Sequence, residues 1–103
     1  MEIGISTASL FMRENTEDAI LTIERLGSKI TEVFFETFPE YTKEFAELLK
    51  GRMKNLKVHS VHVYNMHYEP ELFSDNKRSF DVAMGTFKSV LKNAKLLGAR
   101  NYT

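Results

Sequence analysis

Residues 25–35 read RLGSKITEVFF, and residues 96–103 read LLGARNYT. In each stretch an amphipathic segment ends at a glycine, Gly27 or Gly98, and a strand-like segment follows a few residues later. A glycine just past a helix commonly adopts the left-handed conformation that ends it. The two stretches therefore predict the same joint twice: a helix that ends at glycine and leads into a strand.

Strand-like and helix-like segments alternate outward from these joints along the chain. Each helix-like segment follows residues that cap helices, namely Asn15 or Thr16, Thr42, and Ser74 or Asp75. We expect Gly51 to end the second helix early. The predicted strands are residues 3–7, 30–36 and 58–64, with a fourth that begins near Asn101.

This alternation predicts an α/β fold with a parallel sheet. A doubly wound sheet would carry helices on both faces, whereas a (β/α)8 barrel keeps every helix outside. Polar residues alternate within the predicted strands, at Ser6, Glu32, Glu36, Ser60 and His62, and no glycine-rich turn follows the first strand. Strands buried on both faces are usually continuously apolar, so this pattern favours the barrel.

A barrel of this kind needs about 250 residues. We therefore interpret residues 1–103 as a single partial domain, the N-terminal portion of a (β/α)8 barrel with about three βα units and the start of the fourth strand. Such a portion has open strand edges, which predict self-association.

Composition excludes several other classes of protein. Hydrophobic residues make up 43% and charged residues 27%, which favours a folded chain over a disordered one. Lys plus Arg and Asp plus Glu balance at 14 each, so the chain lacks the overall basic field of a nucleic-acid binder. The absence of cysteine, of a membrane-spanning apolar run and of a signal-peptide pattern predicts a cytoplasmic protein with no membrane partner.

Histidines near the predicted third strand are the first candidates for chemistry. His62 shares a face with Ser60 and Tyr64 near the carboxyl end of that strand. There it could ligate a metal or move a proton, or it could simply form a hydrogen bond to a neighbour. His59 has the opposite parity, so we expect it to point toward the helices. His67 lies in the following loop, a position at which side chains often contact substrate.

Carboxylates near the second strand are the other candidates. Glu36 ends this strand and could bind sugar hydroxyls, orient a ligand or act as a base; the alternative is a solvated charge at a strand end. Glu32 lies deeper, and we expect it to pair with a basic residue. The spacing of His, Asp and Glu matches no metal motif, so no catalytic residue is assigned from the residues alone.

The order of four stretches resembles the xylose isomerase-like barrel superfamily. They are IGISTAS (3–9), LGSKITEVFFE (26–36), LKVHSVHVY (56–64) and LFSDNKRSFDVAMGTFKSVLKNAKLLGAR (72–100). The superfamily includes sugar-phosphate isomerases and epimerases and nucleases of the endonuclease IV type. The resemblance implies a divalent-metal enzyme acting on a sugar or sugar phosphate, with Glu36, His62 and His67 as substrate-binding residues and His62 as a metal ligand.

Three hypotheses follow from this resemblance. The first is an N-terminal part of a sugar isomerase or epimerase that uses Mn, Mg, Co or Zn. The second is an apurinic-site nuclease with a zinc cluster, in which case nucleic acid would be the partner; Val63 and Tyr64 depart from the nuclease pattern at this point. The third is a partial barrel without catalysis. Because the resemblance places most metal ligands on later strands, we expect these 103 residues alone to bind metal weakly and to be inactive.

Overall fold

Four parallel strands lie in sequence order in the computed structural model, which describes residues 3–64 and 67–103. The strands are β1 (Ile5–Ser6), β2 (Ile30–Phe35), β3 (Lys57–Val63) and β4 (Asn101–Tyr102). Each is hydrogen-bonded to the next, so β1 and β4 form the two edges of the sheet. The predicted parallel sheet and its strand order are confirmed.

Three α-helices connect these strands: α1 (Thr16–Arg25), α2 (Lys43–Arg52) and α3 (Lys77–Leu96). Asn15 precedes α1, and the Thr42 hydroxyl accepts a hydrogen bond from the backbone N–H of Phe45 (3.3 Å), as helix caps do. The two glycines of the predicted joints, Gly27 (φ 84°) and Gly98 (φ 80°), both adopt the left-handed conformation.

Two expected helix boundaries are wrong. Gly51 lies inside α2, because its backbone continues the helical hydrogen bonding up to Met53. The cap of α3 is Asn76 rather than Ser74 or Asp75, and its side-chain oxygen accepts a hydrogen bond from the backbone N–H of Ser79 (3.1 Å). Several residues able to cap stand in a row before α3, and the sequence does not distinguish among them.

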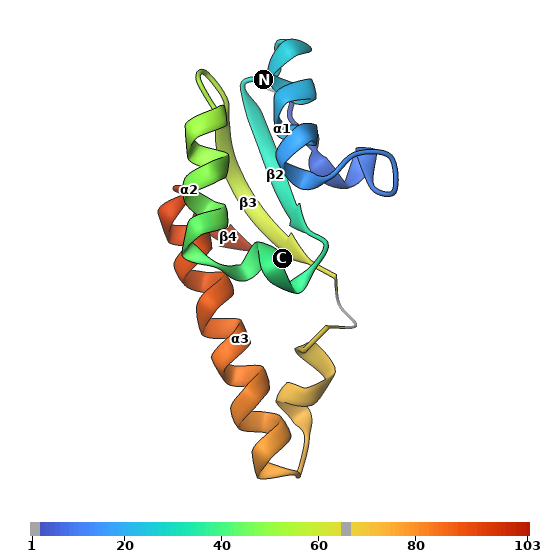
Figure 1. Cartoon of the computed structure of the whole chain (residues 1–103), viewed down its shortest axis with the longest axis vertical. Coiled ribbons are helices and arrows are strands. Elements are labelled where there is room, and N and C mark those ends of the chain that lie inside the picture. The colour runs from blue at the N-terminus through green and yellow to red at the C-terminus, as the bar shows by residue number, and fades with distance from the viewer. Residues whose placement is uncertain (1–2, 65–66) are drawn as a thin grey trace.

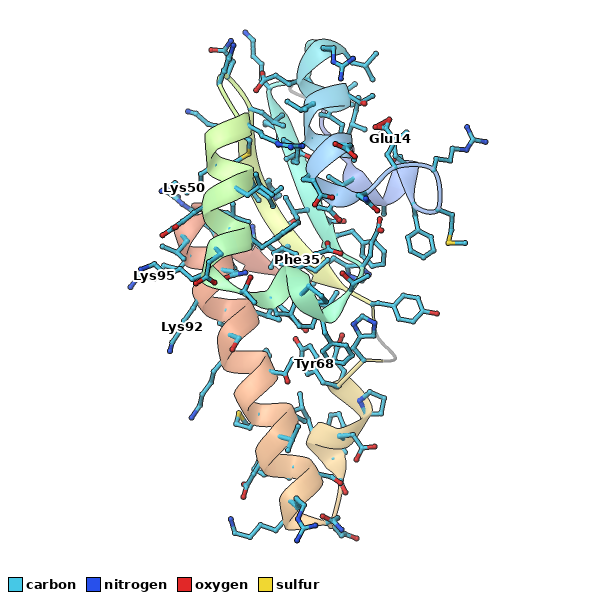
Figure 2. The ribbon with its side chains drawn as sticks, viewed as in Figure 1. Glu14, Phe35, Lys50, Tyr68, Lys92 and Lys95 are labelled. Atoms are coloured by element: carbon cyan, nitrogen blue, oxygen red, sulfur yellow. The ribbon has the colours of Figure 1, made fainter. Side chains whose placement is uncertain are left out.

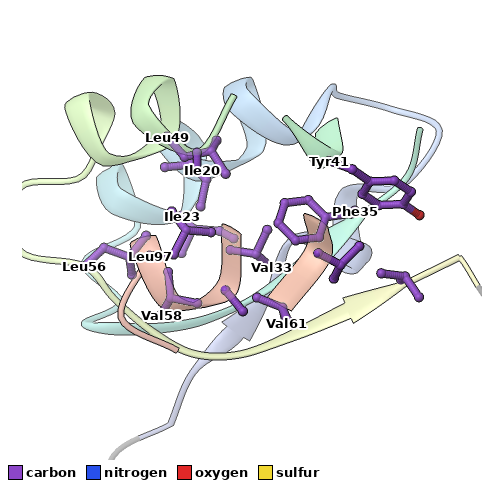
Figure 3. Packing of buried hydrophobic residues seen from close by; sticks show 14 of the residues in the cluster. Ile20, Ile23, Val33, Phe35, Tyr41, Leu49, Leu56, Val58, Val61 and Leu97 are labelled. Carbon is purple, nitrogen blue, oxygen red and sulfur yellow. The ribbon is translucent and has the colours of Figure 1, made fainter. Parts of the chain in front are cut away.

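The three helices cover one face of the sheet (Figure 1). Between the two layers lies the hydrophobic core, in which Val33, Phe35, Val61 and Val63 of the sheet meet Ile20, Ile23, Leu49 and Val90 of the helices, all fully buried. Figure 3 shows Val33, Phe35 and Val61 of the strands on the side of the sheet that faces Ile20, Ile23 and Leu49 of the helices. Each such burial contributes about 1.5–3 kcal/mol to folding. The other face of the sheet, called the open face below, carries Ser6, Glu32, Ser60 and His62.

A register shift between β2 and β3 decides which residues reach which face. Thr31 pairs with Val58 and Glu32 pairs with Ser60, so His59 is the extra residue of a bulge. Val58 therefore joins the core, and Ser60 and His62 lie on the open face. The expectation that His59 points toward the helices is wrong: its side chain is exposed, because the bulge interrupts the alternation on which the expectation relied.

Helix α3 is longer than the sheet is deep. Its first half, together with the 3₁₀ helix Glu69–Phe73, extends beyond the carboxyl ends of the strands (Figure 1). Ala83 is the one buried residue of positions 77–86, whereas Val90, Asn93 and Ala94 of the second half are all buried. Among the described residues, no helix is both long enough and apolar enough to cross a membrane.

Candidate functional site

A carboxylate surrounded by hydroxyls occupies the middle of the open face. Glu32 of β2 accepts hydrogen bonds from Ser60 on β3 (2.9 Å), Ser6 on β1 (3.4 Å) and Thr103 just after β4 (3.4 Å). The parallel register brings these side chains together, because Ser6, Glu32 and Ser60 face one another on adjacent strands. The expectation that Glu32 pairs with a basic residue is wrong. Among the described residues Glu32 forms no salt bridge, and three hydroxyls bind its carboxylate instead.

His62 lies beside this network and is fixed at two places. Its Nδ1 is 3.0 Å from the carbonyl oxygen of Thr103, and its ring stacks on Phe34 with centroids 5.1 Å apart. A carbonyl only accepts hydrogen bonds, so Nδ1 carries the proton. In the neutral ring Nε2 is then an acceptor, which is the state that binds a metal or a hydroxyl group.

Aromatic rings link His62 to His67 across the carboxyl end of the sheet. Phe11 packs edge-on against Phe34 (5.6 Å) and stacks on Tyr64 (6.4 Å), and Tyr64 in turn contacts His67 (5.2 Å between centroids). Phe11 and Tyr64 are both more than one-third exposed. The two histidines thus lie along one aromatic surface, although no direct contact joins them.

His67 is more firmly held than a loop position suggests. Its Nδ1 forms a 2.8 Å hydrogen bond with the hydroxyl of Tyr41, and its ring stacks on Phe38 at 4.4 Å. Burial, and then the neighbouring Tyr102 and Glu40, raise the pKa of Tyr41. The phenol therefore stays protonated at physiological pH and keeps the imidazole in place.

Glu36 directly follows β2 and faces the N-terminal side of α1. It lines a cavity of about 600 Å³ together with both cationic and acidic side chains: Arg13, Glu14, Asp18 and Arg25. Its Oε1 atom is buried and has no hydrogen-bond partner among the described residues. Burial raises the pKa of Glu36 from its usual 4.5 to about 7, and the charges of Glu40 and Glu17 add to the effect. Such a carboxyl group both gives and takes a proton near neutral pH.

Glu40 holds the loop that carries Glu36, and sequence reasoning missed it. Its buried carboxylate accepts hydrogen bonds from the hydroxyls of Thr16 (2.5 Å) and Thr37 (2.6 Å) and from the backbone N–H groups of Thr37 (2.9 Å) and Glu36 (3.2 Å). The Thr37-x-x-Glu40 spacing is a capping-box signal that could have identified it.

Asn93 is a second missed residue, and it fixes the same loop from α3. Its side-chain NH₂ donates to the backbone carbonyls of Glu40 (3.0 Å) and Thr42 (2.7 Å) while the residue is 2% exposed. A buried amide on an otherwise apolar helix face was the available signal, since buried polar groups almost always find partners.

The candidates thus fall into two groups at the carboxyl end of the sheet. His62 and Glu32 converge on Thr103, whereas Glu36 lies on the α1 side, beyond the level of Phe34 and His62. In the described part of the chain, no three His, Asp or Glu side chains are placed to hold a metal ion together. The substrate-binding roles of Glu36, His62 and His67 and the metal role of His62 stay predictions.

Comparison with protein families, curated proteins and solved structures gives no match to this chain. The arguments about its function therefore rest on the residues and the geometry described above.

Replacing Glu36 with glutamine is expected to change how stability depends on pH. Because folding raises the pKa of Glu36, folding favours its protonated form, and its contribution to stability is fully present below about pH 4.5 and is lost as pH rises through about 7. After discounting for solvent screening, we expect Glu36→Gln to match the wild type near pH 4 and to exceed it by about 1–2 kcal/mol near pH 8.

Urea unfolding of both proteins across this pH range measures the difference. Glu44→Gln is the matched control, because it makes the same change at an exposed carboxylate in the first turn of α2. A difference between Glu36→Gln and the wild type that does not vary with pH would contradict the raised pKa of Glu36.

Proposed function

We propose that this chain is the N-terminal part of a β/α barrel that isomerises or epimerises a sugar or sugar phosphate. The observation that carries the proposal is the arrangement of the sheet: four parallel strands in sequence order, helices on one face, and hydroxyls, carboxylates and aromatic rings on the other. A barrel keeps its helices outside and its site at the carboxyl ends of its strands, where these residues lie.

Glu36 is the residue best suited to move a proton. Isomerisation transfers a proton next to a carbonyl group, and a carboxyl group whose pKa is about 7 is matched to that task at neutral pH. The cavity beside it is lined by Arg13, Arg25 and Asn15, which suit the oxygens of a sugar phosphate, and also by the carboxylates of Glu14 and Asp18, which suit sugar hydroxyls. Phe11, which directly precedes Met12 and Arg13 of this cavity, would contact the sugar, whereas His62 and His67 belong to the other group and would contact only a part of the substrate that extends beyond the cavity.

The family resembled implies a divalent metal, which would polarise substrate oxygens when bound. Of the described residues, His62 fits a ligand role, because the carbonyl of Thr103 orients its ring and leaves Nε2 available. One ligand does not make a site, since catalytic metal sites usually have at least three. We therefore propose that later strands of the barrel supply the remaining ligands.

The test of this function uses the polypeptide in which this chain is followed by the later strands. With Mn²⁺ in D₂O, we expect it to place deuterium on the carbon next to the carbonyl of at least one aldose or ketose phosphate. Glu36→Gln should lower kcat by about 100-fold, the usual contribution of a general acid or base. Lys92→Gln is the control, because Lys92 points away from the molecule on α3 (Figure 2). Full activity of Glu36→Gln would remove Glu36 from the chemistry.

The 103-residue chain alone is expected to bind Mn²⁺ and Zn²⁺ only weakly and to show no turnover on sugar phosphates or abasic DNA. Two ligands at most on an incomplete scaffold neither bind a metal tightly nor align a substrate. Titration calorimetry and turnover assays measure this. Tight stoichiometric metal binding together with turnover would show that the chain is a complete enzyme. Self-association through the edges at β1 and β4 also stays a prediction, and analytical ultracentrifugation tests it.

A further inference from the structure

A second groove lies at the opposite end of the sheet from Glu36 and His62. It occupies about 700 Å³ where β2, β3 and β4 begin, a volume in the range of small-molecule sites. Four apolar residues form its floor: Ile30, which is partly exposed, and Leu56, Val58 and Leu97, which are 5–7% exposed and lie together at one end of the core (Figure 3). Nothing in the proposed isomerase function uses this end of the sheet.

Basic side chains from three successive units line this groove. Lys29 stands just before β2, Lys57 begins β3, and Arg100 stands just before β4. The parallel pairing brings the three segments together: the N–H of Lys57 donates to the carbonyl of Lys29 (2.9 Å), and the N–H of Arg100 donates to the carbonyl of His59 (3.4 Å), two residues beyond Lys57. The amide side chains of Asn55 and Asn101 line the same groove.

The side chains that line the groove carry a net positive charge. All three basic side chains are exposed, and none forms a salt bridge with a residue in the described ranges. No acidic residue lines the groove, although the carboxylate of Glu24 accepts hydrogen bonds from the backbone N–H groups of Lys54 and Asn55. Glu24 and the carboxyl ends of the helices, each about half a negative charge, reduce the positive charge of the three cations without reversing it.

We propose that this groove binds a small organic phosphate. The phosphate group would lie between Lys29, Lys57 and Arg100, and the apolar part of the ligand would lie on Ile30 and the exposed edges of Leu56 and Leu97. A phosphomonoester carries close to two negative charges at neutral pH, and the arginine guanidinium matches its oxygens with two parallel hydrogen bonds.

The groove is larger than a phosphate ion needs, and its floor is apolar. An organic group attached to the phosphate therefore gains affinity from the floor, which inorganic phosphate cannot do. The two features together predict the class of ligand. The basic side chains predict an anionic group, and the apolar floor predicts an apolar group attached to it.

Titration of the 103-residue chain, followed by amide NMR shifts at low ionic strength, tests the proposal. The probes are adenosine monophosphate, adenosine and inorganic phosphate. We expect adenosine monophosphate to shift the amides of residues 29–30, 55–59 and 98–101 and to bind more tightly than either other probe. Lys57→Gln and Arg100→Gln should each weaken its binding by about tenfold, the usual loss of a charge-assisted hydrogen bond. Lys92→Gln, on the exposed side of α3, should leave its affinity unchanged.

Three results would overturn the proposal. If adenosine binds as tightly as adenosine monophosphate, the basic side chains contribute nothing to binding. If inorganic phosphate binds as tightly as adenosine monophosphate, the apolar floor contributes nothing. An equal loss in Lys92→Gln would show that the chain attracts anions without a site. The comparison of the three probes on the wild-type chain decides the question even where a variant fails to fold, and the amide spectrum outside the groove reports folding.

Discussion

Replacing Phe35 with alanine is expected to lower the free energy of unfolding by about 3–5 kcal/mol. Phe35 is fully buried at the carboxyl end of β2, where it lies among the interior side chains of Figure 2 and packs edge-on against Tyr41 (5.9 Å) and Phe45 (6.4 Å). The substitution removes this contact and leaves a cavity where the sheet, the Phe38–Tyr41 turn and α2 meet. Urea unfolding followed by far-UV circular dichroism measures the loss.

Phe34→Ala is the matched comparison, since it changes the same residue type one position earlier on the same strand. Phe34 lies on the open face, where Phe11 and His62 cover it, and 8% of its surface is exposed. Because these neighbours lie at the surface and can close over the gap, we expect a smaller loss, about 2 kcal/mol. Equal losses for the two variants would contradict the distinction between a packed face and an open face.

Replacing Glu40 with alanine is expected to cost about 3 kcal/mol, the usual scale for breaking a buried polar network. The change leaves the hydroxyl of Thr16 and the backbone N–H groups of Glu36 and Thr37 without their acceptor in a site that is 7% exposed. Urea unfolding measures this loss too. It should be accompanied by a lower pKa for Glu36, because the nearby charge of Glu40 is one of the causes that raise it.

Two further variants make this result specific to the network. Glu40→Gln keeps one acceptor oxygen and the side-chain volume, so its loss should be intermediate. Glu47→Ala removes an exposed carboxylate that forms an (i, i+4) ion pair with Lys43 on α2, and should cost only about 0.5 kcal/mol. Equal losses for Glu40→Ala and Glu47→Ala would mean that the buried hydrogen bonds contribute nothing.

Much of the fold could be predicted because it depends on local periodicity. The helix ends at Gly27 and Gly98, the cap at Thr42 and the strand order all follow from residues close in sequence. The face on which His59 lies could not be predicted, because the bulge arises from the pairing of β2 with β3. A shift of one residue reverses the face of a strand residue. The uneven spacing of Val58, Val61 and Val63 signals an irregularity between residues 58 and 61, but it does not show which residue bulges.

The candidate site could be predicted only in part, for a similar reason. The positions of Glu36 and His62 in their strands predicted that both lie near the carboxyl end of the sheet. They did not predict that the two residues lie on separate sides of it. The carbonyl that orients His62 comes from Thr103, which is far away in sequence, and the buried contacts of Glu40 and Asn93 join three segments of chain. Such long-range hydrogen bonds are consequences of packing, and residue type alone does not reveal them.

The overhang of α3 gives its two halves different dynamics. Amide hydrogens exchange with solvent through local opening, and the free energy of that opening follows how much packed surface is exposed. We expect the second half to open only together with the core around Val90 and Ala94, and residues 77–86, of which Ala83 alone is buried, to unwind at a lower free energy. On this expectation one continuous helix contains two units of cooperativity, and the boundary between them lies near the edge of the sheet rather than at a break in the sequence.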